Sequence, residues 1–66
     1  MWSARSRVDW YSVSRRLAQT PHLRLVIGFY CGKPALVHGT RVLATTPKDA
    51  FAVIRELSAG RLALAA

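Results

Sequence analysis

The chain has 66 residues, 52% of them hydrophobic, and its ten lysines and arginines against three acidic residues give a formal net charge of +7. This length makes one small basic domain, residues 1–66, and such domains usually need a disulfide, a metal or a partner to supplement their core. The single cysteine excludes an intrachain disulfide, and the cysteine and two histidines lack the paired spacing of zinc modules. The hydrophobic content exceeds what a lone domain needs, so we expect a homo-oligomer or a subunit of a larger complex.

The sequence predicts neither a membrane span nor a signal peptide. The longest uncharged run, residues 25–32, is far shorter than the about 20 apolar residues that cross a bilayer. Arg5 and Arg7 interrupt the N-terminal segment before a hydrophobic region develops. We therefore expect a cytoplasmic protein without membrane contact; an organellar targeting segment over residues 1–20, which are rich in Arg and Ser, is the alternative.

The first helix is expected over residues 7–18. Ser6 fits the N-cap position, and Asp9 three residues later completes a pair similar to a capping box. Pro21 ends the helix, because proline disfavours helical backbone in the residue before it. One narrow face points to the core: Trp10, Val13 and Leu17.

Three strands with short connections follow, which predicts an antiparallel meander. Residues 23–31 alternate with period two and form the first strand, residues 35–37 the second and residues 40–45 the third. We expect turns at residues 32–34 and at His38-Gly39. Cys31 is interpreted as a small buried hydrophobe. The core face of the first strand carries five residues: Leu23, Leu25, Ile27, Phe29 and Cys31.

The second helix has the clearest local signals. Thr46 fits the N-cap, Pro47 the first helical position and Asp49 the third, while Gly60 fits the C-terminal cap. Its apolar stripe has helical spacing: Ala50, Phe51, Val53, Ile54 and Leu57. The predicted fold class is α+β, in the order helix, three-stranded antiparallel β-meander, helix (αβββα).

The second face of the sheet decides how much apolar surface stays exposed. Val26 and Tyr30 lie on it, with Val37 or Leu36 and Val42 or Leu43 as their companions. If both helices pack on the opposite face, this face forms an exposed patch of the kind that marks an interaction site. If one helix packs on each face, no patch is left. The candidate protein interface is Val26, Tyr30, Val37 and Val42.

No catalytic set is predicted, and we expect a protein that is not an enzyme and takes no cofactor, metal or small-molecule substrate. Asp9 and Asp49 are explained as helix-capping acids rather than an acid/base pair. Both histidines fall in a loop or turn. Cys31 has no evident activating neighbour beyond Lys33, and the four glycines lack a phosphate-binding spacing.

The basic residues indicate a polyanion or an acidic protein surface as partner. A GC-rich coding sequence would also explain why eight of the ten are arginines. Arg15 and Arg16 point away from the apolar face of the first helix and can meet phosphates, with Tyr11 or Trp2 as a stacking ring. The candidate contacts to nucleic acid or an acidic partner are Arg5, Arg7, Arg15, Arg16, Arg24 and Arg41.

The element order resembles that of the double-stranded-RNA-binding domain, whose second helix starts with a lysine-rich motif; Lys48, with Asp49 beside it, occupies that region here. A three-stranded sheet followed by a helix also resembles the arm-binding domains of phage integrases, which read DNA with the sheet. Residues 32–34 and 39–41 are similar to the signature of small antitoxin-like proteins, with a spacing one residue longer. No residue role is transferred from these families.

The sequence favours a small non-enzymatic regulatory or accessory binding protein, of the kind that phages and mobile elements encode, that contacts nucleic acid through arginines. The alternative is a protein-binding inhibitor or adaptor. That protein would act through an apolar sheet face or edge on a larger, acidic partner, with a homodimer as one form of it.

Overall fold

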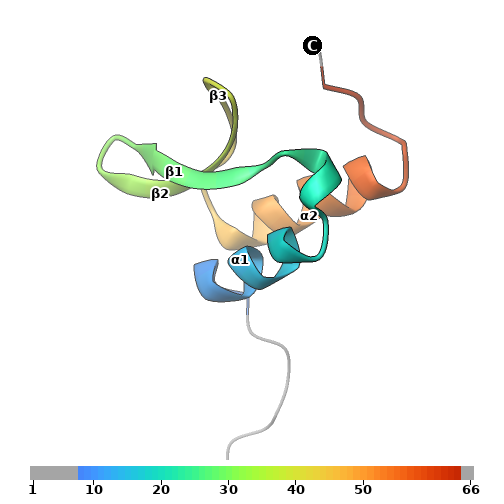
Figure 1. Cartoon of the computed structure of the whole chain (residues 1–66). Helices are drawn as coiled ribbons and strands as arrows, with labels where there is room; N and C mark the ends of the chain where they lie inside the picture. The colour runs from blue at the N-terminus through green and yellow to red at the C-terminus, as the bar shows by residue number, and fades with distance from the viewer. Residues whose placement is uncertain (1–7, 65–66) are drawn as a thin grey trace, which may run out of the picture.

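The computed structural model describes residues 8–64 and confirms the α+β class with the predicted element order (Figure 1). The sheet has three antiparallel strands in the order β1-β2-β3. The elements in chain order are α1 (Trp10–Ala18), a short 3-10 helix η1 (Pro21–Leu23), β1 (Val26–Tyr30), β2 (Lys33–His38), β3 (Arg41–Ala44) and α2 (Pro47–Ser58).

Helix α1 begins later than the sequence pattern predicts. Asp9, expected inside the helix, is itself the N-cap, and its Oδ1 accepts a hydrogen bond from the backbone N–H of Ser12 at 2.8 Å. An aspartate at this position satisfies one of the amide donors that a helix start leaves without a partner. Ser6 and Arg7, the expected N-cap and first helical residue, lie outside the described residues.

The connection from α1 to the sheet corrects the expected start of the first strand. Pro21 opens η1, whose N-terminal position suits the fixed φ of proline, so Leu23 is helical rather than extended. Arg24 then takes a left-handed conformation with φ 58, and the strand begins only at Val26. Leu23 still packs against the core, as expected from its apolar character.

The β1–β2 turn corrects two further predictions. Tyr30 pairs with Lys33, so the loop consists of Cys31 and Gly32, and both have positive φ, 54 and 78. Two central residues with positive φ define a type I′ turn, whose twist matches that of the flanking strands. Cys31 is therefore an exposed turn residue and not a buried one, and the turn precedes the expected residues 32–34.

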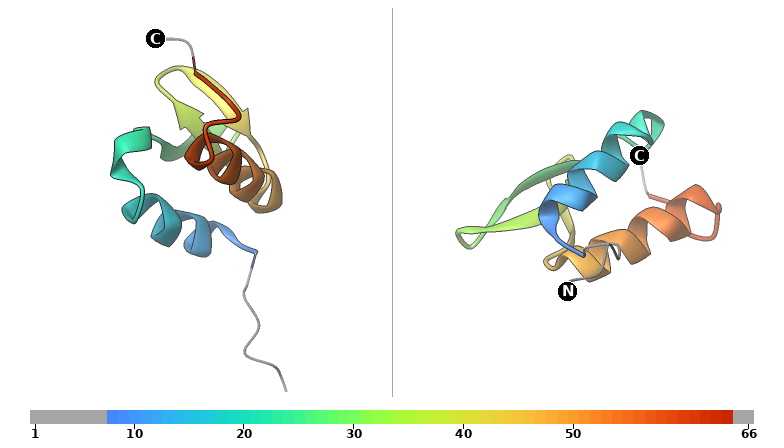
Figure 2. Two further views of the ribbon diagram at one scale, coloured as in Figure 1. Left: turned by 90° about the vertical axis from the view of Figure 1, so that its right-hand side faces the viewer. Right: turned by 90° about the horizontal axis from the view of Figure 1, so that it is seen from below.

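Phe29, expected in the core, is 77% exposed. Figures 1 and 2 show why: the β1–β2 hairpin projects past both helices, so neither α1 nor α2 packs on its end. The alternation itself holds closer to the helices, where Leu25 is buried and Ile27 packs against the core.

The second hairpin turn lies at Gly39 and Thr40, one residue after the expected His38-Gly39, because His38 pairs with Arg41. Gly39 has φ 63, a value at the first central position that suits a type II′ turn. The register then shifts, so that Val37 faces Val42 while Leu36 faces Ala44, which marks a bulge in β3.

Pro34 lies in the central strand, a position that usually excludes proline. Its partner on β1 is Phe29, and this pair comes directly before the Tyr30–Lys33 pair that flanks the turn. Because hydrogen-bonded and non-hydrogen-bonded pairs alternate along antiparallel strands, the nitrogen of Pro34 points away from β1. On that side β3 pairs with β2 only from Leu36 onward. The missing N–H therefore removes no hydrogen bond from the sheet.

Both helices pack on the same face of the sheet, which decides between the two arrangements considered above (Figures 1 and 2). The buried cluster joins α1, the sheet and α2, and the expected helix faces, including Trp10, Leu17 and Phe51, contact it. Within residues 8–64, no helix packs on the other face of the sheet. The buried members are Val13, Leu25, Leu36, Ala44, Ala50 and Ile54.

The signals predicted for α2 are confirmed at both ends. Thr46 Oγ1 accepts from the N–H of Asp49 at 3.2 Å, and Pro47 is the first helical residue. At the C-terminus, Gly60 has φ 75, its N–H donates to Leu57 O at 3.1 Å, and the N–H of Arg61 donates to Glu56 O at 3.0 Å. This pair of bonds is a Schellman motif.

The side chains of Arg61 and Glu56 reinforce that cap. Arg61 Nε and Nη2 donate to the two carboxylate oxygens of Glu56, each at 3.0 Å. This contact takes the place of the apolar one that often accompanies the motif. Neither helix among residues 8–64 has the length and apolar character needed to cross a membrane.

Candidate functional site

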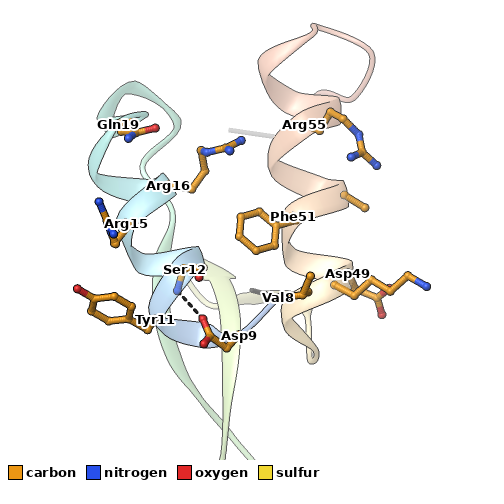
Figure 3. A pocket seen from close by; sticks show the side chains of 12 residues that line it. Val8, Asp9, Tyr11, Ser12, Arg15, Arg16, Gln19, Asp49, Phe51 and Arg55 are labelled. Atoms are coloured by element: carbon orange, nitrogen blue, oxygen red, sulfur yellow. Dashed lines mark hydrogen bonds between the residues drawn. The ribbon is translucent and has the colours of Figure 1, made fainter. Parts of the chain in front are cut away.

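A groove of about 870 Å³ runs between α1 and α2 (Figure 3). We call it the inter-helix groove and define it by its lining residues. The α1 side contributes Val8, Asp9, Tyr11, Ser12, Arg15, Arg16 and Gln19. The α2 side contributes Lys48, Asp49, Phe51, Ala52 and Arg55.

Helical spacing brings these side chains to the groove. Ser12, Arg16 and Gln19 follow one another at four and three residues on α1, which puts them on one face. On α2, Lys48 and Arg55 are seven residues apart, with the lining residues Phe51 and Ala52 between them. Each helix therefore presents to the groove one surface that mixes cations with apolar or small side chains.

Two arginines of α1 lie over aromatic rings. Arg16 Cζ lies 5.7 Å from the ring centroid of Phe51 on α2, and Figure 3 shows both side chains between the helices. Arg15 Cζ lies 6.0 Å from the ring centroid of Tyr11, on the side of α1 away from α2 in the same view. Both separations fall within the range in which a ring attracts a cation. The rings thus help to fix the positions of two positive charges.

The charge of the groove is unevenly distributed. Four cations line it, against the two carboxylates of Asp9 and Asp49. The Asp9 carboxylate is engaged as the cap of α1, and Asp49 is an exposed residue in the first turn of α2. The excess positive charge comes from Arg15 and Arg16 on α1 together with Lys48 and Arg55 on α2.

The structure brings together only some of the basic residues singled out from the sequence. Arg15 and Arg16 line the groove, whereas Arg24 precedes β1 and Arg41 begins β3, and neither lines it. Arg5 and Arg7 lie outside the described residues. Lys48 and Arg55 were not among the predicted contacts. Their seven-residue spacing could have indicated a shared face of α2, but only packing shows that this face meets α1.

The four residues of the candidate protein interface share the uncovered face of the sheet. Val26 pairs with Val37, and Val37 pairs with Val42, so the three valines form one row across the strands. Val26 is 57% exposed, Tyr30 53% and Val42 36%, while Val37 is half-buried. We call Val26, Tyr30, Val37 and Val42 the valine-row surface.

Gly28 shapes this surface. A Cβ at that position would lie 3.3 Å from Cγ2 of Val37, closer than nearly all real contacts of this kind. The absence of a side chain at Gly28 therefore leaves room for the Val37 side chain beside β1.

Residues 8–64 contain no group of three or more His, Cys, Asp or Glu side chains that could hold a metal ion. At the end of α2, hydrogen bonds from Arg61 lower the pKa of the exposed Glu56 carboxyl from 4.5, and the same contact raises the pKa of Arg61. Comparison of the chain with protein-family models, curated proteins and solved structures finds no significant match.

Proposed function

We propose that this chain is a small non-enzymatic binding protein, regulatory or accessory in role, that contacts nucleic acid through the inter-helix groove. One observation carries the proposal: two helices contribute four cations to a single groove, and two of these cations are held over aromatic rings.

Phosphate groups are the ligand that this distribution of charge suits. Lysines and arginines that neutralise phosphates release condensed counterions, which gives affinity that falls steeply with salt. The net charge of +7 adds attraction at longer range and speeds the encounter. The two groove carboxylates lie toward the N-terminal ends of α1 and α2, where capping and the helix dipole explain their presence.

A titration with matched charge variants tests the proposal. A fluorescein-labelled oligonucleotide is titrated with the protein at two salt concentrations, about 50 and 200 mM. The variant Arg15→Gln/Arg55→Gln removes two groove cations, and the control Arg24→Gln/Arg41→Gln removes two cations that do not line the groove. Circular dichroism verifies that both variants are folded.

We expect binding at low salt, weakening by about tenfold or more at higher salt. The groove variant should lose more affinity and have a smaller salt slope than the control variant. Absence of binding at low salt, or equal losses in the two variants, would refute the groove as the nucleic-acid site.

A second candidate function concerns the valine-row surface, and its occupant there would be a second copy of this chain. Val26 and Tyr30 are more than half exposed on a sheet face that neither α1 nor α2 covers. All three acidic residues are on or beside the helices, and the row itself carries no charge. Lys33, the cross-strand partner of Tyr30, lies at one end of this surface, so the uncharged contact between two copies would centre on the three valines.

Sedimentation velocity from about 10 to 300 µM tests this second candidate, in the concentration range where weak dimers separate from monomers. The variant Val26→Lys/Val42→Lys places charge on the row, and Phe29→Lys, on the opposite face of the exposed hairpin, is the control. Dimerisation that is lost only in the row variant supports the surface as the interface. A monomer at every concentration, or a dimer that the row variant leaves intact, argues against it.

A further inference from the structure

Building on the proposed function, we infer that the inter-helix groove takes single-stranded rather than duplex nucleic acid, with a base stacked on the ring of Tyr11. We infer this ligand class because cations lie beside planar groups that can stack on bases, namely the Tyr11 ring and the Arg16 guanidinium. Binding of phosphate alone would not require such planar groups.

Tyr11 is the first part of this combination. Its side chain is 69% exposed although the ring is large and mainly apolar, so it contributes little to the core. It lies at the rim of the groove beside Arg15, whose guanidinium is 6.0 Å from the ring centroid. A ring accessible beside a cation is the arrangement that protein surfaces use to stack one base while neutralising the adjoining phosphate.

Arg16 and Phe51 are the second part. Phe51 is half-buried between the helices, and the guanidinium of Arg16 lies over it (Figure 3). Contact with the ring restrains this long side chain, so the planar guanidinium is held in the groove in advance of binding. Arginine planes, like aromatic rings, serve as platforms on which unpaired bases stack.

The shape of the site favours a single strand over a duplex. Bases in a duplex are already stacked on one another, so a duplex would meet the groove with its backbone and leave Tyr11 without a stacking partner. The groove volume of about 870 Å³ lies in the range of sites that hold small molecules, roughly 300–1,000 Å³. Individual nucleotides of a single strand are of that size. A nucleic-acid strand laid across the two helices would pass Tyr11 and Arg15 on the outer side of α1, Arg16 and Phe51 between the helices, and Arg55 on α2 (Figure 3).

Acidic peptides are the competing ligand class, because carboxylates also bind arginine. The exposed ring at the rim argues for nucleic acid, since every base presents a flat face for stacking whereas a run of acidic side chains presents none. A glutamate decamer is therefore included as a separate ligand in the test.

The test compares labelled 12-nucleotide single strands, of DNA and of RNA, with a duplex of the same length and with the glutamate decamer. Binding is measured by fluorescence anisotropy at two salt concentrations. Tyr11→Leu removes the ring but keeps an apolar side chain, and Tyr11→Phe restores the ring. Arg15→Gln removes a cation that can neutralise a phosphate and keeps the Tyr11 ring, and thermal unfolding verifies that each variant is folded.

We expect a single strand to bind at least tenfold more tightly than the duplex. Tyr11→Leu should weaken single-strand binding about 5- to 100-fold, as expected for one stacked base, with an unchanged salt slope. Tyr11→Phe should bind like the original protein, and Arg15→Gln should reduce the slope.

The outcomes separate failure of this inference from failure of the proposed function. Equal or tighter duplex binding, or single-strand binding that Tyr11→Leu leaves intact, refutes the stacked single strand while nucleic-acid binding stands. Binding of the glutamate decamer without binding of any oligonucleotide overturns both.

Discussion

The guanidinium of Arg16 on α1 covers the ring of Phe51 on α2, with Cζ 5.7 Å from the ring centroid. This contact joins the two helices at the centre of the inter-helix groove, on the side of the helices away from the sheet. It therefore belongs both to the stability of the helix pair and to the surface that we propose for binding.

A double-mutant cycle measures that contact. Arg16→Gln and Phe51→Leu, alone and combined, should give a coupling free energy of about 0.5–1 kcal/mol in urea unfolding, because the cation lies over the ring at an exposed site. The control cycle pairs Phe51→Leu with Arg15→Gln, since Arg15 lies over Tyr11 instead. Equal coupling in the two cycles would contradict a specific contact between Arg16 and Phe51.

Substitutions at Leu36 and Phe29 distinguish the core from the exposed hairpin. Leu36 is fully buried in the central strand, so Leu36→Ala should lower the free energy of unfolding by about 3–5 kcal/mol. A chain of 66 residues has only about 3–10 kcal/mol in total, so this variant should be largely or partly unfolded.

Phe29→Ala should change stability by no more than about 0.5 kcal/mol, because the side chain is 77% exposed. Far-ultraviolet circular dichroism during thermal unfolding measures both variants. A loss at Phe29 as large as that at Leu36 would place Phe29 in a packed environment in solution.

The turn at Cys31 offers a stabilising substitution. Cys31 has φ 54, a left-handed conformation that costs most residues other than glycine about 1–2 kcal/mol. Cys31→Asn creates the Asn-Gly pair favoured in type I′ turns and should raise the unfolding free energy by about 0.5–1 kcal/mol. Urea unfolding measures the change.

Gly32→Ala is the matched control at the next position of the same turn. A methyl group there meets no neighbouring atom within 4 Å, but φ is 78, so the variant should be destabilised by backbone strain alone. Destabilisation by Cys31→Asn would contradict the type I′ assignment.

The Glu56–Arg61 pair predicts a dependence of stability on pH. Hydrogen bonds from Arg61 lower the pKa of Glu56 below 4.5 in the folded chain. A group with a lowered folded-state pKa stabilises the fold above its unfolded pKa, and that contribution is lost as the pH falls through the folded pKa. The stability difference between the original chain and Glu56→Gln should therefore be present at neutral pH and vanish in acid.

Carbon-detected NMR titration of the Glu56 carboxyl gives a direct measurement. Arg61→Gln should raise the pKa toward 4.5, because it removes the hydrogen bonds that are the largest cause of the shift. Arg55→Gln should raise it less, since Arg55 contributes only a smaller coulombic effect. The same titration at high salt should change the Arg55 effect more than the Arg61 effect.

Most of the fold could be predicted from the sequence because its signals are local. The Thr46-Pro47 start and the Gly60 end of α2 depend on the backbone within a few residues, and the structure confirms them. The meander follows from short connections, which permit little besides antiparallel neighbours.

Apart from shifted element ends and turns, the errors concern burial, which depends on where the layers end. Phe29 continues the alternation of Leu25 and Ile27 and is nonetheless exposed, because the hairpin projects past the helices. Cys31 fits the same period but occupies a turn. Alternation along a strand predicts which side chains share a face of the sheet. It does not predict how far along that face the helices extend.

The two candidate sites also differ in how far the sequence predicts them. Val26, Val37 and Val42 were predicted to share a face from their alternation, with Leu36 and Leu43 as alternatives, whereas the register that puts them in one row comes from turns that lie elsewhere than predicted. The groove was not predicted, since its cations come from helices separated by the whole sheet in sequence and adjacent only after packing. Arg24 and Arg41, predicted with Arg15 and Arg16, lie outside it for the same reason.

The proline in the central strand has a consequence for how such chains can assemble. β2 extends past β3 at Pro34, where a strand from another molecule would find no backbone N–H to bond with. β3 itself has only four residues and contains a bulge. The outer edge of β1 is then the one edge in residues 8–64 with a regular run of five residues. A fibre of stacked sheets needs two usable edges in every subunit, whereas a subunit with one can only form a pair. Pro34 and the bulge therefore make this side of the sheet less suited to pairing with a further strand than the outer edge of β1.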